Sequence, residues 1–164
     1  MLRRLPSIVT MILLLFTTKV CFGNTTDRIT ECFIKAGKYY DIPPIVLWGI
    51  AYVESSFNPL AVNYNKSSRD LGIMQINTRW LPVLNQYGIY EKHLYDPCIN
   101  IFVGAWILKR CQISYKDWED VLSCYHTGKG ASKNQRGKVY AKKVFKVIKK
   151  ATYAYKADKT KRNS

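Results

Sequence analysis

Residues 53–80 read V-E-S-S-F-N-P-L-A-V-N-Y-N-K-S-S-R-D-L-G-I-M-Q-I-N-T-R-W, and they carry the strongest indications of the fold. Glu54 ends an apolar run, and Asp70 follows sixteen residues later, just before a compact apolar segment. The residues between them are mostly small and polar, which favours turns or a short β-ribbon. This order predicts one carboxylate at the end of a helix and a second across a polar loop, facing each other over a groove.

The apolar run before Glu54 predicts a buried helix over residues 43–55, because it is apolar nearly all round. Burial and the negative end of the helix dipole would both raise the pKa of Glu54, as a general acid at neutral pH requires. The alternative is a solvent-exposed Glu54 where the helix frays. Two carboxylates, one protonated and one charged, are the arrangement that glycoside cleavage uses. For Asp70 the alternative is a turn residue that hydrogen-bonds its own backbone.

Helical spacing of apolar residues and capping side chains predict further helices along the chain. Residues 129–137 read as a flexible basic loop, and residues 156–164 as a disordered basic tail. At most one small β-ribbon fits between the helices, so the fold class is mainly α, with one domain over residues 24–155. The other helices are predicted over residues 24–40, 79–87, 96–110, 117–125 and 139–155.

Two residues near Asp70 could serve either structure or binding. The segment 72–76 has little charge and is expected to lie beneath the groove. Gln75 is its polar exception and would bind either a sugar or a neighbouring backbone group. Trp80 would either stack on a sugar ring or belong to the core. The sequence leaves both pairs of alternatives open.

Residues 1–23 have the pattern of a secretory signal peptide. A positively charged start precedes an apolar run over residues 8–16, and Cys21 and Gly23 supply the small residues that a signal peptidase reads. The apolar run is short for an uncleaved membrane anchor. Lipid attachment at Cys21 is disfavoured by the residues before it. We therefore expect the chain to be exported.

Export affects the interpretation of the cysteines, because disulfides form in oxidising compartments. An even number remains after the signal peptide, which suggests two disulfides with three possible connectivities, of which Cys111–Cys124 closes a short loop. A metal site is the alternative, but the chain has no C-x-x-C motif and only His93 and His126 could assist. We therefore expect neither a metal nor a cofactor. The four remaining cysteines are Cys32, Cys98, Cys111 and Cys124.

The net charge of +15 over 164 residues belongs mainly to the C-terminal segment. Thirteen of the 26 basic residues lie at or after Lys129, where Asp158 is the only acid. Such a segment fits a polyanionic partner, such as cell-wall polymer, acidic lipid or nucleic acid, or else it is a solvated tail. Export and the expected disulfides argue against nucleic acid.

Several segments, in order and at matching spacing, resemble the signatures of the lytic transglycosylase (SLT, lysozyme-like) family. They are E-S-S-F-N-P, G-I-M-Q-I, the N-I-F-V-G-A-W-I-L helix, S-C-Y-H-T-G and V-Y-A, and they cover roughly residues 30–145. Cys124, His126 and Thr127 depart from the family's A-Y-N-A-G pattern, whereas Tyr125 keeps it. Animal-type lysozymes share the first two segments but lack the later ones and carry more cysteines. C-F-I-K-A and Y-D-P-C are most similar to the small invasion-associated (IagB-like) transglycosylases, which accompany type III secretion systems.

This resemblance implies a goose-lysozyme/SLT-type fold and periplasmic cleavage of the MurNAc-β-1,4-GlcNAc bond of peptidoglycan. Glu54 would donate a proton and later accept one, which leaves a 1,6-anhydromuramyl product. Members of the group often carry only the cysteines that match Cys32 and Cys98, which implies that pair and leaves Cys111 to pair with Cys124. By the same resemblance, sugar or the catalytic loop would be oriented by Ser55, Asn58 and Gln75. Tyr125 would lie beside Glu54 and contact the substrate.

The presence of Asp70 leaves two reaction products possible, anhydromuramyl or hydrolytic. A typical lytic transglycosylase has no carboxylate at this position, whereas lysozymes do. If Asp70 acts as a second catalytic carboxylate, the enzyme would be a muramidase that hydrolyses the same bond. A third possibility is a non-catalytic basic wall-binding module, although intact Glu54, Gln75 and Tyr125 argue against it. The expected partners are peptidoglycan strands and components of a secretion apparatus, and the chain is expected to be a monomer.

Overall fold

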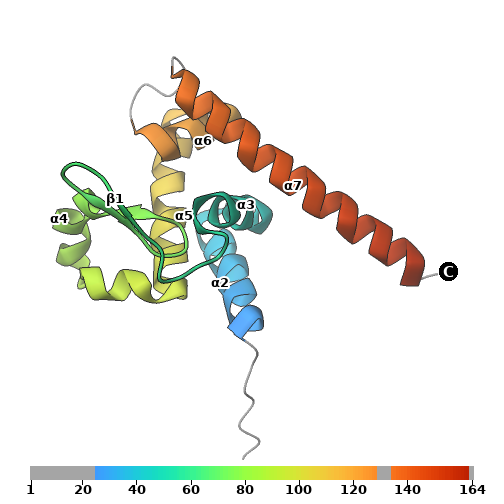
Figure 1. The fold of residues 1–164 in the computed structure, drawn as a ribbon, viewed down its shortest axis with the longest axis horizontal. Helices are drawn as coiled ribbons and strands as arrows, with labels where there is room; N and C mark the ends of the chain where they lie inside the picture. The colour runs from blue at the N-terminus through green and yellow to red at the C-terminus, as the bar shows by residue number, and fades with distance from the viewer. Residues whose placement is uncertain (1–24, 129–133, 163–164) are drawn as a thin grey trace, which may run out of the picture.

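The structure, a computed structural model, describes residues 25–128 and 134–162. Helices surround the long helix α5, and a small antiparallel sheet lies to one side of it (Figure 1). The mainly α fold class predicted from the sequence is confirmed. The helices are α2 (Thr25–Tyr40), α3 (Pro44–Ser55), α4 (Leu81–Leu84), α5 (Pro97–Ser114), α6 (Trp118–Thr127) and α7 (Gln135–Arg162), with 3₁₀ turns η1 (Thr78–Trp80), η2 (Asn85–Tyr87) and η3 (Glu91–Tyr95). The expected signal peptide lies outside the described residues.

The helices begin at residues whose side chains favour a first turn. Pro44 opens α3, where a missing N–H removes no helical hydrogen bond. Asp96 caps α5 by accepting hydrogen bonds from the backbone N–H groups of Cys98 and Ile99, at 2.9 and 3.0 Å. Asp117 caps α6 in the same way. These local signals explain why the sequence predicted these starts to within a residue or two.

The core lies between α5 and the helices around it. α2 and α6 pack against α5, and α7 packs across α6 and α3. Close approach of α7 depends on two glycines, because a Cβ on Gly49 would lie 2.7 Å from Ile148 and one on Gly137 would lie 2.8 Å from Ser123. The largest fully buried side chains are Leu47, Ile50, Leu71, Ile73, Met74, Ile76, Leu94, Ile101, Leu108, Leu122, Val121 and Val144.

Two disulfides tie the helices together. Cys32 is bonded to Cys98, which joins α2 to the start of α5, and Cys111 is bonded to Cys124, which joins α5 to α6. These are the two pairings expected from the sequence. The first closes the longer loop, 66 residues apart in sequence, and so constrains the unfolded chain more.

The sheet is larger than the ribbon expected from the sequence. It has three strands in the order β1-β2-β3, all antiparallel. The segment expected to form one helix over residues 79–87 is instead divided into η1, α4 and η2, because Pro82 interrupts the helical hydrogen bonds. The strands are β1 (Val62–Tyr64), β2 (Arg69–Leu71) and β3 (Ile76–Asn77).

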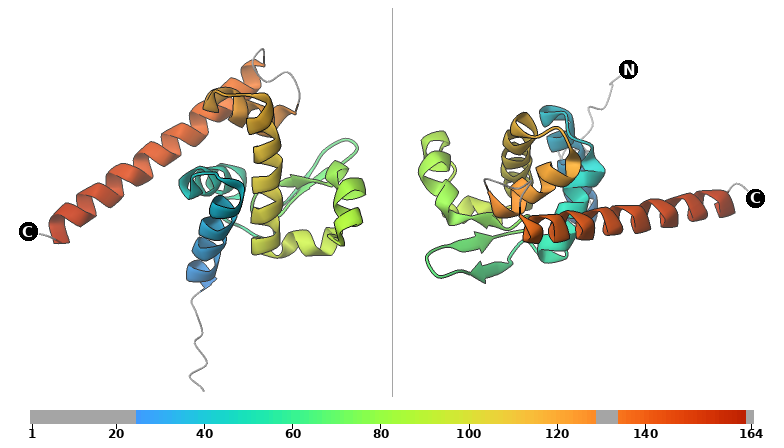
Figure 2. Two further views of the ribbon diagram at one scale, coloured as in Figure 1. Left: turned by 180° about the vertical axis from the view of Figure 1, so that it is seen from behind. Right: turned by 90° about the horizontal axis from the view of Figure 1, so that it is seen from above.

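The last helix is longer than predicted, and this corrects the expected loop and tail. α7 begins at Gln135 and ends at Arg162, so most of the tail expected to be disordered is helical. No Pro or Gly interrupts residues 138–162, Ala and Lys favour helix, and Asp158 forms an ion pair with Arg162 one turn on. The C-terminal half of α7 projects beyond the other helices (Figure 2). Within the described residues, every helix is too short or too polar to span a lipid bilayer.

Candidate active site

Glu54 lies in the last turn of α3, a helix whose middle is buried in the core. Burial raises the pKa of Glu54 from 4.5 to about 7, a hydrogen bond from Tyr140 lowers it, and the nearby charge of Asp70 raises it. The direction agrees with the sequence-based expectation. A carboxyl group with this pKa exchanges a proton readily near neutral pH. The chain leaves α3 through Ser56 and Phe57, which have left-handed φ values of 52° and 67°. Such strained backbone is common next to active sites.

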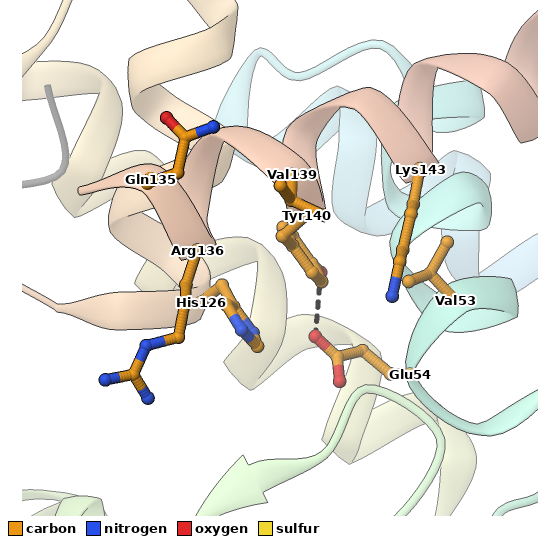
Figure 3. Close-up of a pocket in the computed structure, with 8 residues that line it drawn as sticks. All are labelled: Val53, Glu54, His126, Gln135, Arg136, Val139, Tyr140 and Lys143. Carbon is orange, nitrogen blue, oxygen red and sulfur yellow. Dashed lines mark hydrogen bonds between the residues drawn. The ribbon is translucent and has the colours of Figure 1, made fainter.

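Tyr140 holds the carboxyl group of Glu54. Its hydroxyl donates a 2.7 Å hydrogen bond to Oε1 of Glu54, across 86 residues of sequence (Figure 3). Tyr140 comes from the second turn of α7 and is only 5% exposed. The second carboxyl oxygen points away from Tyr140, so Oε2 is the atom that carries the acidic proton. Sequence analysis placed Tyr140 in a family segment but gave it no role in the site.

Asp70 lies in the centre of the sheet, where the strand register surrounds it with amides. On β2 it pairs with Asn63 of β1 on one side and with Asn77 of β3 on the other. Its Oδ2 accepts hydrogen bonds from Asn63 and Asn65, at 3.3 and 2.9 Å, and its Oδ1 accepts one of 2.6 Å from Asn77. Three donors suit an ionised carboxylate, which accepts hydrogen bonds and donates none. Asp70 is therefore more than the turn residue considered from the sequence.

The segment between the two carboxylates is anchored to the helices by polar side chains. Ser55 Oγ donates a 2.8 Å hydrogen bond to the carbonyl of Ile73, and Tyr125 Oη donates one of 2.8 Å to the carbonyl of Met74. Gln75 donates to the carbonyls of Gly72 and Ala61, at 2.9 and 3.2 Å. Of the two roles considered for Gln75, the structure therefore places its amide on neighbouring backbone.

The pKa of Tyr125 is affected by both carboxyl groups. Burial raises its pKa well above the usual value, and the carboxylates of Glu54 and Asp70 raise it further. Both carboxyl groups therefore lie close enough to Tyr125 to act on it. The phenol therefore remains neutral while it donates its hydrogen bond to the carbonyl of Met74.

Two further predicted site residues are not among those that line the pocket beside Glu54. Trp80 is partly buried against the core and packs edge-on against Trp106 at 5.3 Å, with the Arg110 guanidinium over both rings. A sugar-stacking role for Trp80 stays a prediction. Asn58 is exposed, and its Oδ1 accepts a 3.0 Å hydrogen bond from the N–H of Leu60 in the turn after α3. A sugar-binding role for Asn58 stays a prediction.

Glu54 opens into a pocket of about 380 Å³ between α3 and α7. His126 lies flat against Tyr140 at 4.4 Å between ring centroids. Shielding from water lowers the pKa of His126, as do the charges of Lys143 and Arg136, whereas Asp70 raises it. Two cations of α7 therefore face the site. The pocket is lined by Val53, Glu54, His126, Gln135, Arg136, Val139, Tyr140 and Lys143 (Figure 3).

Comparison with known proteins identifies the family of this chain. A family model described as the transglycosylase SLT domain matches residues 31–148, which is most of the chain. The chain belongs to the SLT transglycosylase family. It is a peptidoglycan lytic transglycosylase, as the family match, the relatives and the fold together support.

Relatives of this SLT transglycosylase are similar over most of their length. Invasion protein IagB of Salmonella typhi is 37% identical over 136 residues, covering 82% of this chain and 85% of that protein. Protein IpgF of Shigella flexneri is 35% identical over 130 residues, covering 77% and 84% of the two chains. X polypeptide of Escherichia coli is 33% identical over 143 residues, covering 83% and 79%.

A solved structure shares the fold at low sequence identity. An inactive glutamine-for-glutamate variant of lytic transglycosylase Slt from Pseudomonas aeruginosa matches with a TM-score of 0.62 at 16% identity. The match covers 78% of this chain but only 24% of Slt, so this SLT transglycosylase spans about a quarter of that protein. The likeness shows that the two share a fold.

The contact between Tyr140 and Glu54 predicts a change in the pH dependence of this SLT transglycosylase. Because the Tyr140 hydroxyl lowers the pKa of Glu54, Tyr140→Phe is expected to raise that pKa above about 7. The general acid would then stay protonated to higher pH, and the alkaline fall of kcat/KM would shift upward. Loss of the orienting hydrogen bond is expected to lower kcat/KM itself by up to about 100-fold.

The measurement is a pH profile of kcat/KM for peptidoglycan solubilisation. Tyr155→Phe, at an exposed position further along α7, is the matched control and is expected to behave as wild type. An unchanged alkaline limb in Tyr140→Phe would contradict a role for Tyr140 in setting the pKa of Glu54.

Proposed function

We propose that this enzyme cleaves the β-1,4 bond between N-acetylmuramic acid and N-acetylglucosamine and releases a 1,6-anhydromuramyl product. The observation that carries the proposal is the state of Glu54, a shielded carboxyl group with a pKa of about 7 that Tyr140 holds by one oxygen. One such group can serve as acid in the first step and as base in the second.

The proposed reaction needs no water. Glu54 donates its proton from Oε2 to the glycosidic oxygen as the bond from that oxygen to C1 breaks. The resulting carboxylate then takes the proton of the C6 hydroxyl on the same muramyl residue. That oxygen closes onto C1, and Glu54 returns to its protonated form for the next cycle. Atoms and protons balance with the glycan as the sole substrate.

Asp70 is proposed to stabilise the positive charge that develops at C1. Its carboxylate is held by three asparagine amides and acts on Glu54 through its charge. This same observation favours a second candidate function, because paired carboxylates in unlike environments also serve lysozyme-type hydrolysis. In that case Asp70 would work beside Glu54 while water attacks C1.

The product distinguishes the two candidates. Purified peptidoglycan is digested with the mature enzyme, and the released muropeptides are analysed by mass spectrometry. We expect anhydromuramyl ends, which weigh one water less than reducing ends. Asp70→Asn is expected to slow their release by roughly 100-fold or more, because electrostatic stabilisation of the transition state is lost. Reducing ends would replace the transglycosylase proposal by the hydrolytic one, and no cleavage by wild type would overturn both.

We further propose that the chain acts in the periplasm and opens the wall locally for a type III or related secretion apparatus. The pattern of residues 1–23 supports export, and the two disulfides suit an oxidising compartment. The similarity to a protein named as an invasion protein supports the secretion context. Cell fractionation tests the first part, and loss of secretion on deletion, restored by wild type but not by Glu54→Gln, tests the second.

A further inference from the structure

The pocket beside Glu54 has an unusual charge distribution on its α7 wall. Arg136 and Lys143 are seven residues apart, two helical turns, so both lie on the face of α7 that carries Tyr140 to Glu54. Figure 3 shows them on either side of Tyr140, with the Lys143 amine on the side of Val53 and the Arg136 guanidinium beyond His126. Two cations thus flank the acid that is proposed to start the reaction.

In the part of the chain that the structure describes, no carboxylate is paired with either cation. Throughout residues 25–128 and 134–162, neither side chain forms a hydrogen bond or an ion pair with an acidic residue. Among the described residues, Glu54 is the only acid lining the pocket, and its bonded oxygen is occupied by Tyr140. The positive charge therefore acts on the space inside the pocket. Burial is the larger cause of the lowered pKa of His126, and both cations also lower it.

A pocket of about 380 Å³ can admit a substituent of a sugar ring next to the scissile bond. Cations with free donors are suited to a carboxylate, which Arg binds through two parallel hydrogen bonds and Lys as a point charge. Peptidoglycan carries carboxylates on its muramyl residues and stem peptides, whereas a polymer of N-acetylglucosamine carries none.

We propose that Arg136 and Lys143 form a subsite that binds a carboxylate borne by the muramyl residue of the glycan. This inference rests on the proposed function and adds to it a reason why the enzyme would prefer an acidic glycan strand to a neutral one. The carboxylate belongs either to the stem peptide or to the lactyl group that remains when the peptide is absent. Both sources present the same group, a carboxylate, and the experiment distinguishes them.

The test compares kcat/KM on peptidoglycan with free carboxyl groups and on the same material after these groups are converted to neutral amides. Wild type is expected to prefer the free form by roughly five- to thirtyfold, the range for two charge-assisted contacts in a partly open site. In the double variant Arg136→Gln/Lys143→Gln the ratio is expected to fall to about one. Lys142→Gln/Lys146→Gln removes the same charge from α7 outside the pocket and is expected to keep the wild-type ratio.

Peptide-free glycan prepared with an amidase identifies the source of the carboxylate. A preference kept on this glycan assigns the lactyl group, and a preference seen only on intact peptidoglycan assigns the stem peptide. Equal ratios in the double variant and its control, or a ratio near one in wild type, would overturn the inference.

Binding separates this inference from the proposed function. The affinity of Glu54→Gln for free and amidated muropeptides is measured by calorimetry, with and without the two pocket substitutions. A wild type that cleaves nothing would end the proposed function, while the calorimetric ratio would still decide whether Arg136 and Lys143 bind a carboxylate.

Discussion

Glu54→Gln is expected to reduce the release of muropeptides by roughly 1,000-fold or more, the largest effect on activity among single substitutions. Glutamine keeps the shape of the side chain and can still accept the Tyr140 hydrogen bond at its Oε1 position. It has no acidic proton for the glycosidic oxygen and cannot take the proton of the C6 hydroxyl. The chemical step should therefore fail while the substrate still binds.

The assay for Glu54→Gln measures initial rates of peptidoglycan solubilisation near neutral pH. Glu31→Gln removes an exposed glutamate paired with Lys35 on α2, and this control is expected to keep wild-type activity. If Glu54→Gln retained a tenth of the wild-type rate, another group would have to be the acid.

The same substitution is expected to alter the dependence of stability on pH. The pKa of Glu54 is about 7 when folded against 4.5 for the exposed group, so the folded state binds this proton more tightly. The proton on Glu54 stabilises the folded state fully below the lower of these two pKa values, and this stabilisation is lost as pH rises to about 7. The free energy of unfolding decreases by roughly 3 kcal/mol over this range. Urea melts at about pH 5 and about pH 8 should show that Glu54→Gln lacks this decrease.

Asn100→Leu is expected to lower the free energy of unfolding by roughly 3–6 kcal/mol, the largest effect on stability. Asn100 is fully buried on α5, and its Nδ2 donates to the carbonyls of Leu71 and Leu94 at 2.8 and 2.7 Å. Its Oδ1 accepts a 2.8 Å hydrogen bond from the N–H of Met74. Leucine fits a similar volume but removes all three of these buried hydrogen bonds to the backbone.

Urea denaturation with both disulfides oxidised measures this loss. Gln86→Leu introduces the same apolar side chain at an exposed amide and is expected to stay within about 0.5 kcal/mol of wild type. A loss below about 1 kcal/mol in Asn100→Leu would mean that the segment linking Glu54 to the sheet does not depend on this side chain. Since Asn100 anchors Leu71 and Met74, we also expect lower activity in the variant that remains folded.

The parts of the fold predicted from sequence are those with local causes. Three helix starts are marked by Pro44, Asp96 and Asp117. The two aspartates accept hydrogen bonds from backbone N–H groups of the first turn, and Pro44 has no N–H that would need a partner there. The apolar run of α3 implied burial, and burial implied a raised pKa for Glu54. The length of α7 was missed because neither Gly nor Pro ends it, and weak local preferences alone did not distinguish a helix from a solvated tail.

The partners of the two carboxylates were not predictable from local sequence. Tyr140 lies 86 residues from Glu54, and only the close approach of α7 at Gly49 brings them together. In the sequence Asn63 looks like a turn residue and Asn77 like a helix cap, and only the strand register places both beside Asp70. Trp80 follows the motif directly, yet its ring packs on Trp106.

By itself the sequence determined the fold class, the order of the helices, and an acid at the end of a buried helix. Apolar periodicity, helix caps and composition involve residues that are close together in sequence, so they can be recognised from the sequence alone. The tertiary structure alone decided which hydroxyl holds Glu54, which amides hold Asp70, and which cations line the pocket. Hydrogen bonds and charges act over a few ångströms of space, and those distances exist only after segments far apart in sequence have packed together.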